Sequence, residues 1–258
     1  MKFILSFLFC YCTQVIMAQT LTVMSYNIHH GADKDERDRV AEMGAFIRKS
    51  GADIIGLQEV DSACTRSNSV NQMKKLSEIT GMHYAFVRHF EYQGGAYGMG
   101  ILSCYPIENV YNKRMTLLKS KSPSTAMIVA DIILRNGKKV VFASAHFALD
   151  DSSRMLQARE VISYLGEEKY PVIFTGDLNA EPNAPEIRLL KEYFTETDPK
   201  NILTFPAPVA VKKIDYIFIR NPHLKRIKQH TVPVNALSDH LPVMAEVKLK
   251  KISMDHGR

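Results

Sequence analysis

The stretch TGDLNAEP, residues 175–182, marks a point where an apolar strand ends in polar side chains. The residues just before it, PVIF at 171–174, form a short apolar run bounded by a proline and a glycine, which predicts a buried strand. Asp177 and Asn179 lie two residues apart, and side chains at positions i and i+2 of an extended chain point to the same side. The stretch therefore predicts a strand that carries a carboxylate and a carboxamide into one pocket at its end.

The same apolar patterns, followed outward from this strand, predict the rest of the fold. Further strands are expected over residues 21–26, 53–60, 82–87, 101–103, 107–117, 125–134, 139–147, 214–219, 223–232 and 241–249. Helices are expected over residues 37–49, 70–79, 151–165 and 184–193. The alternation of strands and helices, together with several hairpins, indicates an α/β sandwich with mixed sheets.

Residues 94–100, GGAYGMG, are expected to form a flexible loop. They are not a phosphate-binding P-loop, because no Gly-Lys-Ser/Thr follows and a strand comes next where a P-loop needs a helix.

Residues 1–18 differ from the rest of the chain and predict a secretory signal peptide. Lys2 is the only charge, residues 3–9 are almost wholly apolar, and the segment ends at the small residue Ala18, where cleavage is expected. The alternative is a membrane anchor, but a spanning helix needs about 20 apolar residues and polar side chains interrupt this shorter segment. We therefore expect an exported protein, periplasmic or extracellular, with one domain over residues 19–258 and no transmembrane segment.

The composition is that of an ordinary globular protein, with 46% apolar and 23% charged residues. Without residues 1–18 the chain has 32 basic and 27 acidic residues, a net charge of +5. This mild positive charge suits an anionic substrate or surface, although it is also common in proteins that bind nothing anionic. Cys64 and Cys104 could form one disulfide in an exported protein, and no CxxC or Cys/His zinc spacing is present.

Polar side chains occur where the expected strands end. They are Asn27, Glu59, His146, Asp177 with Asn179, Asp215, and Asp239 with His240. Taken singly, each has an ordinary structural explanation, such as a turn residue, a solvated carboxylate, a core histidine or a helix cap. Taken as a set, carboxylates and histidines at neighbouring strand ends are the groups that metal-assisted phosphoester cleavage requires.

The order of the motifs resembles the endonuclease/exonuclease/phosphatase superfamily. The matching motifs are YNI at 26–28, LQEVD at 57–61, Tyr97-Gly98 followed by ILS at 101–103, His146, GDLN at 176–179, IDYI at 214–217 and SDHLPV at 238–243. The resemblance implies a four-layer α/β sandwich of the deoxyribonuclease I type, in which two packed mixed β-sheets are flanked by helices. It also implies hydrolysis of a phosphoester with a divalent metal at one edge of the sheets.

The resemblance also implies which residues bind the metal. Glu59 would be the principal ligand, Asn27 would lie beside it, and Asp239 would complete the oxygen shell directly or through water. Carboxylate, amide and water oxygens are the ligands that Mg²⁺ prefers. His29 stands where many relatives have an acidic or amide residue, so Mn²⁺ or Ca²⁺ remains an alternative to Mg²⁺.

The remaining matching residues would act on water and phosphate. His146 would face the phosphate from the side opposite His240, and Tyr97 would touch a phosphate oxygen. Two schemes stay open for the general base. In one, His240 acts with Asp215 behind it, because histidine is best suited to proton transfer near neutral pH. In the other, Asp177 and Asn179 orient the attacking water.

The motifs identify the family more specifically than they identify the substrate. We expect a monomer that hydrolyses a small or lipid-derived phosphoester, as a phosphodiesterase or phosphatase. A secreted nuclease on DNA or RNA is the first alternative, but the sequence offers neither aromatic stacking platforms nor a concentrated stripe of Lys and Arg. A sphingomyelinase or phospholipase C-like enzyme is a further alternative. A catalytically dead binding module is the alternative outside the enzymes, and it predicts the loss of a catalytic residue, whereas all are present.

Overall fold

The computed structural model describes residues 19–118, 125–220, 224–231 and 236–249. The predicted signal peptide, residues 1–18, lies outside the described residues, so it stays a prediction. Among the described residues, no helix has the length and apolar character needed to cross a membrane.

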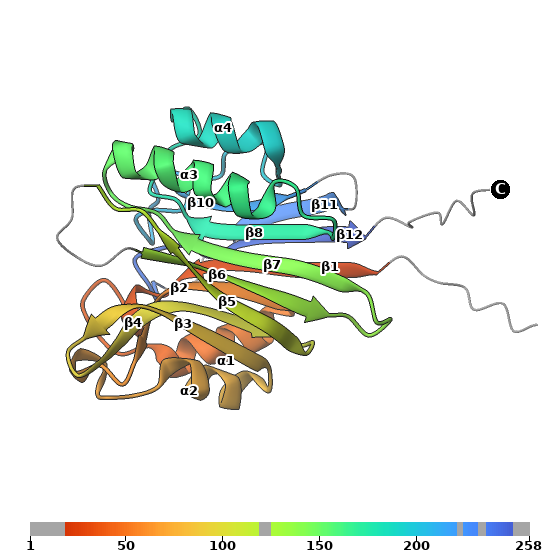
Figure 1. Ribbon diagram of the computed structural model, residues 1–258. Coiled ribbons are helices and arrows are strands. Elements are labelled where there is room, and N and C mark those ends of the chain that lie inside the picture. Colours follow the sequence, from red (N-terminus) through yellow and green to blue (C-terminus); the bar gives the residue numbers. More distant parts are fainter. Residues whose placement is uncertain (1–18, 119–124, 221–223, 232–235, 250–258) are drawn as a thin grey trace, which may run out of the picture.

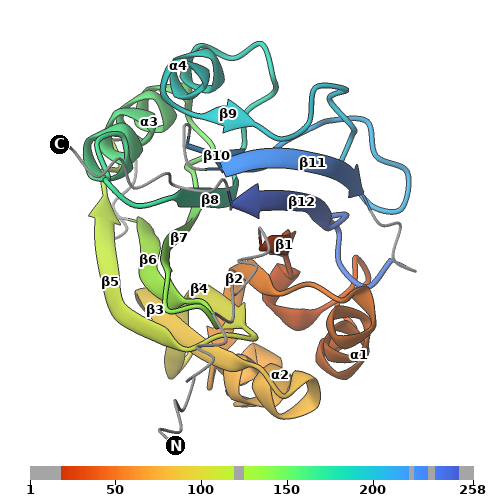
Figure 2. The same cartoon turned by 90° about the vertical axis from the view of Figure 1, so that its right-hand side faces the viewer.

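The described strands form two six-stranded sheets that pack face to face (Figures 1 and 2). The first sheet has the order β11 (Leu224–Thr231), β12 (Val243–Leu249), β1 (Thr20–Asn27), β2 (Ile54–Ser62), β4 (Gly95–Ser103) and β3 (His83–Tyr92). The second has the order β5 (Ile107–Met115), β6 (Thr125–Ile133), β7 (Lys139–His146), β8 (Val172–Asp177), β10 (Asp215–Ile219) and β9 (Thr195–Glu196). Both sheets are mixed, because β1 with β2 and β7 with β8 are parallel pairs among otherwise antiparallel neighbours.

Helices cover the outer face of each sheet, so the predicted four-layer α/β sandwich is confirmed (Figure 2). Helices α1 (Val40–Ser50) and α2 (Gln72–Thr80) pack on the first sheet, and α3 (Asp151–Leu165) and α4 (Pro185–Tyr193) on the second. Two short 3₁₀ helices, η1 (His29–Gly31) and η2 (Thr65–Ser67), follow β1 and β2.

The central strands are buried on both faces, which explains their continuous apolar sequence. In β8, Ile173 packs into the core between the sheets, whereas Val172 and Phe174 pack against α3 and α4. In β1, Val23 faces the core between the sheets, and Tyr26 faces the α1 side. Successive side chains of a strand point to opposite faces, so each central strand serves two cores.

The glycine-rich residues 94–100 do not form the predicted loop. The turn is confined to Gln93 and Gly94, and β4 begins at Gly95. Glycine is needed there because neighbours are close. A Cβ on Gly98 would lie 2.0 Å from the carbonyl oxygen of Val87 on β3. The glycines therefore allow close packing within the strand, and they do not provide flexibility.

Cys64 and Cys104 are both free thiols, the first buried and the second exposed. The disulfide considered from the sequence is not formed.

Candidate active site

A cleft of about 970 Å³ opens where strands of the two sheets end. Seven of the nine predicted site residues line it: Glu59, Tyr97, His146, Asp177, Asn179, Asp239 and His240. The other two, Asn27 and Asp215, are buried and contact these residues by hydrogen bonds. The fold therefore brings all nine together.

Glu59 enters the cleft from an irregularity in β2. The register between β2 and β4 shifts between Leu57 and Val60, which marks a β-bulge, and Glu59 adopts the left-handed conformation with φ 57°. A side chain with a Cβ rarely adopts this conformation, and such residues concentrate at functional sites. The bulge directs the Glu59 carboxylate into the cleft, where its side chain is 21% exposed.

Asn27 joins the two sheets at the floor of the site. Its Nδ2 donates to Glu59 Oε1 and to Asp177 Oδ2, each at 3.0 Å, and its Oδ1 accepts the backbone N–H of His29 at 2.9 Å. The amide therefore fixes one carboxylate from each sheet. In this arrangement the Asn27 oxygen faces a backbone donor, and its role beside a metal remains a prediction.

Asp177 and Asn179 meet in the cleft for a different reason from the one predicted. β8 ends at Asp177, and Asn179 has φ 48°, so the chain between them is not extended. Instead, the backbone N–H of Asn179 donates to Asp177 Oδ1 at 3.0 Å. The Asn179 Nδ2 donates to the carbonyl of Phe147 at 2.9 Å and lies 3.1 Å from His146 Nε2.

His240 and Asp215 form a buried pair. His240 Nδ1 lies 3.0 Å from Asp215 Oδ2, and Asp215 is opposite Asp177 in the register of β8 and β10. Burial lowers the pKa of His240, but the carboxylates of Asp215 and Asp177 outweigh that effect and raise it to about 10. Burial also raises the pKa of the Asp215 carboxyl against the opposing charge of His240. Without a cation, His240 therefore holds its proton at neutral pH, with Nε2 3.6 Å from Asp177 Oδ2.

Ser238 fixes this pair relative to Asn27. Its hydroxyl donates to the carbonyl of Asn27 at 2.8 Å and accepts the backbone N–H of His240 at 3.2 Å. The Phe205 ring packs on the His240 ring, with centroids 4.7 Å apart. Ser238 thus holds the His240 backbone, whereas Phe205 and Asp215 contact its imidazole.

Glu59 and Asp239 are the residues best placed to hold a divalent cation. Their carboxylates lie 3.8 Å and 3.6 Å from the same atom, His29 Nδ1, and their side chains are 21% and 25% exposed toward the cleft. Two carboxylates that water can reach match the donor set that Mg²⁺ or Mn²⁺ needs. Glu59, His146 and Asp177 offer a second combination, with one ligand atom from each within 4.8 Å of the others. The residues present therefore fit a divalent metal.

Arg66 is a cleft residue that the sequence analysis missed. Its guanidinium forms two hydrogen bonds to the buried Asp61, at 2.8 Å and 2.9 Å, and lies over the rings of Tyr92 and Tyr97. The sequence signal was Arg66 five residues after Asp61, just beyond the LQEVD motif. Arginine suits phosphate recognition because its donors form a planar fork.

Aromatic side chains line the cleft, although the sequence indicated no aromatic stacking platforms for a nucleic acid. Phe90, Tyr92, Tyr97 and Phe205 all line the cleft. Tyr97 lies between the Phe90 ring, 5.2 Å away by centroids, and the His89 ring, 5.7 Å away. Burial, with the nearby Glu59 carboxylate, raises the pKa of Tyr97 well above its usual value, so its hydroxyl stays a neutral hydrogen-bond donor.

Comparison with known proteins agrees with this architecture. The chain is 26% identical over 245 residues to the uncharacterized protein YbhP of Escherichia coli, covering 88% of this chain and 96% of YbhP. An endonuclease/exonuclease/phosphatase family protein from Bacteroides thetaiotaomicron has a similar structure, with a TM-score of 0.71, 19% identity and coverage of 91% of this chain and 99% of that one. The structure of ANGEL2, described as a 2′,3′-cyclic phosphatase, gives a TM-score of 0.71 at 15% identity, covering 92% and 97%.

At these identities the solved structures establish the fold alone, whereas the family match rests on sequence. The Endonuclease/Exonuclease/phosphatase family matches residues 24–240, a span that includes all nine predicted site residues. Members of this family are typically divalent-metal-dependent phosphoester hydrolases. The chain belongs to the endonuclease/exonuclease/phosphatase family.

Proposed function

We propose that this protein is an exported phosphoester hydrolase that uses Mg²⁺, or alternatively Mn²⁺ or Ca²⁺, on a small or lipid-derived substrate. The observation that carries the proposal is the convergence of a carboxylate pair for a cation, Glu59 and Asp239, with the His240–Asp215 pair at one cleft. Export rests on the sequence of residues 1–18 alone.

A cation held by Glu59 and Asp239 would supply positive charge for the phosphoryl oxygens and for the negative charge that develops during hydrolysis. Asn27 keeps Glu59 in place for this task through its hydrogen bond to Oε1. His240 Nε2, with its partner Asp215 at Nδ1, can donate a hydrogen bond to a phosphoryl oxygen.

Asp177 and Asn179 are best placed to position the attacking water, and the Asp177 carboxylate can accept its proton. Asp177 accepts hydrogen bonds from Asn27 and from the Asn179 backbone, so its carboxylate is held rigidly at the wall of the cleft. Without a bound cation, the carboxylates of Asp215 and Asp177 raise the pKa of His240 and keep its proton in place, which supports Asp177 as the general base of the proposal.

The size of the cleft suits a small phosphoester. About 970 Å³ lies at the upper end of the range for small-molecule sites. The exposed Leu149 and the Phe205 ring give its wall an apolar part, which suits a substrate with an organic or lipid portion.

A secreted nuclease is the second candidate, favoured by a specific observation. Tyr92 and Phe205 line the cleft, and Arg66 lies over the Tyr92 ring. Bases can stack on exposed aromatic rings, and arginine can contact the adjacent phosphate.

The deciding experiment is a phosphoester panel with the purified mature protein. Sugar phosphates, inositol phosphates, sphingomyelin, nucleotides and DNA are offered with Mg²⁺, Mn²⁺ and Ca²⁺ in turn, and bis-p-nitrophenyl phosphate serves as a generic diester. We expect hydrolysis that EDTA abolishes and that Glu59→Ala and His240→Ala reduce to background. His83→Ala, which changes an exposed histidine on β3, is the matched control.

Activity that persists in EDTA or in Glu59→Ala would overturn the metal-hydrolase proposal. Rapid cutting of plasmid DNA at low enzyme concentration would instead select the nuclease. Mass spectrometry of protein recovered from the producing cells tests export, which predicts a mature chain that begins at Gln19.

A further inference from the structure

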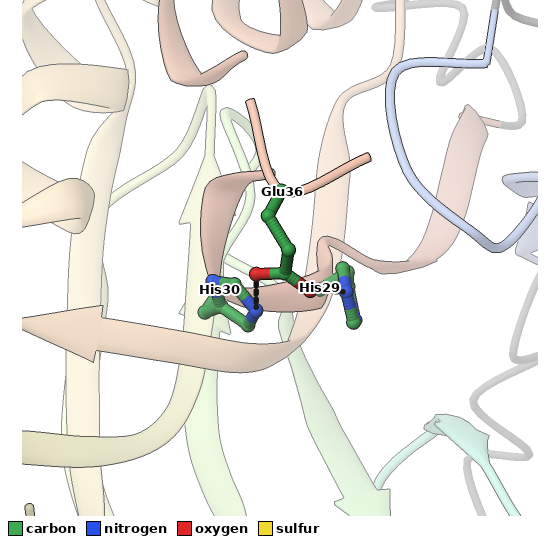
Figure 3. A group of neighbouring side chains, drawn as sticks. All are labelled: His29, His30 and Glu36. Atoms are coloured by element: carbon green, nitrogen blue, oxygen red, sulfur yellow. Dashed lines mark hydrogen bonds and ion pairs between the residues drawn. The ribbon is translucent and has the colours of Figure 1, made fainter. Parts of the chain in front are cut away.

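Three side chains beside the cleft, outside the nine predicted site residues, converge on one point. His29 Nε2 lies 3.1 Å from Glu36 Oε1, and His30 Nε2 lies 3.2 Å from Glu36 Oε2. Figure 3 shows the Glu36 carboxylate between the two imidazole rings. One ligand atom from each residue lies within 4.8 Å of the other two. We propose that His29, His30 and Glu36 form a second metal site that takes Zn²⁺ or a similar transition-metal ion.

The backbone directs these side chains at a cost. His29, His30 and Glu36 all adopt left-handed conformations, with φ of 45°, 44° and 61°. Residues other than glycine rarely adopt this conformation, which persists only where the surroundings enforce it. A relaxed backbone at any of the three positions would turn its side chain away from the common point.

Hydrogen bonds enforce the two histidine positions. The backbone N–H of His29 donates to Asn27 Oδ1 at 2.9 Å, and the His30 carbonyl accepts Gln72 Nε2 at 2.5 Å. The turn ends at Gly31, where a Cβ would lie 2.4 Å from Val40 Cγ2. The two imidazoles are therefore set by β1, α1 and α2 before any ion binds.

Asp33 holds the loop that carries Glu36. Its carboxylate accepts the backbone N–H groups of Asp35 and Arg37 at 2.9 Å and 3.1 Å, and the Arg39 Nε at 2.9 Å. Asp33 itself is 5% exposed. The backbone is therefore tied on both sides of Glu36, and the contacts with His29 and His30 place its exposed carboxylate.

The donor set selects the class of ion. Two imidazole nitrogens and one carboxylate, with a position left for water, form the ligand set of three-residue zinc sites. The two imidazole nitrogens face different oxygens of the Glu36 carboxylate, at 3.1 Å and 3.2 Å, and one ligand atom from each residue lies within 4.8 Å of the others, a spacing that one bound ion can draw together. Mg²⁺ and Ca²⁺ prefer oxygen ligands, so this site and the Glu59–Asp239 pair would take different ions.

One ring of this cluster lies between two carboxylates. His29 faces carboxylates from both nitrogens, because Nδ1 lies 3.6 Å from Asp239 Oδ1 while Nε2 faces Glu36. A cation on Nε2 leaves the N–H on Nδ1 for Asp239, the arrangement in which a carboxylate orients a metal-bound histidine.

Access and charge also suit a cation. The Glu36 side chain is 66% exposed, so an ion and a bound water can enter from solvent, while His29 and His30 are 23% and 10% exposed. The adjacent hollow of about 80 Å³ is lined by Glu36, Asp38 and Arg66, and the charge of Arg66 is matched by Asp61. Asp38 pairs with Lys75 at 3.8 Å, so Glu36 is the carboxylate of this hollow that faces the two histidines.

The test measures Zn²⁺ binding and does not depend on activity. The mature protein carrying Glu59→Gln, which removes a ligand of the catalytic cation, is titrated with Zn²⁺ by calorimetry and against a chromophoric chelator. We expect one equivalent to bind. Adding Glu36→Gln or His30→Gln is expected to weaken this binding at least 10-fold, while Asp35→Asn, on the same loop and paired with Lys34 and Arg37, leaves it unchanged.

Titration with Co²⁺ provides the second readout. We expect the visible absorption spectrum of a four-coordinate Co²⁺ with nitrogen ligands. The proposal is overturned if Glu59→Gln binds no Zn²⁺, if Glu36→Gln and His30→Gln keep the full affinity, or if Asp35→Asn loses as much as they do. Glu36→Gln decides the matter should His30→Gln fail to fold, because Glu36 is exposed and its exchange buries nothing. Failure of the hydrolase proposal would leave these binding measurements intact.

Discussion

At the scale of single residues, Asp177 has two competing roles, metal ligand or positioning group for water. It is 1% exposed, it accepts hydrogen bonds from Asn27 and Asn179, and it faces both His146 and His240. Glu59 and Asp239, by contrast, are the carboxylates that solvent reaches. This contrast favours the water-positioning role for Asp177.

Asp177→Asn tests this assignment. The change keeps the shape and removes the charge, so we expect kcat on bis-p-nitrophenyl phosphate to fall by about 10²- to 10⁴-fold. Mn²⁺ affinity, followed by electron paramagnetic resonance, should change only a few-fold, whereas Glu59→Gln should lose most of it. If Asp177→Asn loses the metal to the same extent as Glu59→Gln, the division of roles is wrong.

The types and positions of the site residues could be predicted from the sequence, but the directions in which their side chains point could not. Residue type and order along the chain were enough to name Glu59, Asp177 and His240. Glu59 and Asn179 point into the cleft because each adopts a left-handed backbone conformation, which no pattern of apolar and polar residues reveals. Arg66 was missed because its link to the cleft is the pairing with Asp61 and the contact with tyrosines from other strands.

At the scale of elements, apolar periodicity located the helices and most strands. It failed at residues 94–100, where close contacts with neighbouring elements determine which residues the strand can contain. Residues 94–100 predict a loop because glycine is common in loops. In β4 the glycines are present because β3 and α2 leave no room: a Cβ on Gly100 would lie 2.3 Å from Met73 Sδ. Such contacts come from residues distant in sequence, so local pattern cannot predict them.

Gly98→Ala should therefore destabilise the fold. The added methyl group would meet the Val87 carbonyl oxygen at 2.0 Å, and backbone atoms must move to admit it. We expect the free energy of unfolding to fall by about 1–3 kcal/mol, measured by urea denaturation. Gly94→Asn is the matched control, because the turn has open space and asparagine tolerates φ 79°. Equal stability of Gly98→Ala and the wild type would show that β3 and β4 are not tightly packed.

At the scale of the whole molecule, a buried polar contact joins the two sheets near the cleft. His89 on β3 lies with Nε2 2.9 Å from the Ala126 carbonyl on β6, and the side chain is 2% exposed. Burial, assisted by nearby His146, lowers the pKa of His89 to about 3. The sheets therefore pack around a neutral imidazole.

This burial predicts a pH dependence of stability with a definite sign. The unfolded chain binds a proton at His89 below about pH 6.5, while the folded chain does not until about pH 3. Acidification across this window therefore favours unfolding, by up to about 1.4 kcal/mol for each pH unit. His89→Gln removes the titrating group and keeps an N–H donor for Ala126, so it should flatten the dependence.

Urea denaturation in EDTA at several values between pH 7 and pH 4 measures the effect. As the pH falls, the free energy of unfolding of the wild type should decrease faster than that of His89→Gln. Near pH 7 the difference between the two proteins should become constant. His83→Gln, an exposed histidine on the same strand, should follow the wild type. Parallel curves for the wild type and His89→Gln would mean that the sheets separate in acid for another reason, such as protonation of the carboxylates that Asn27 joins across the cleft floor.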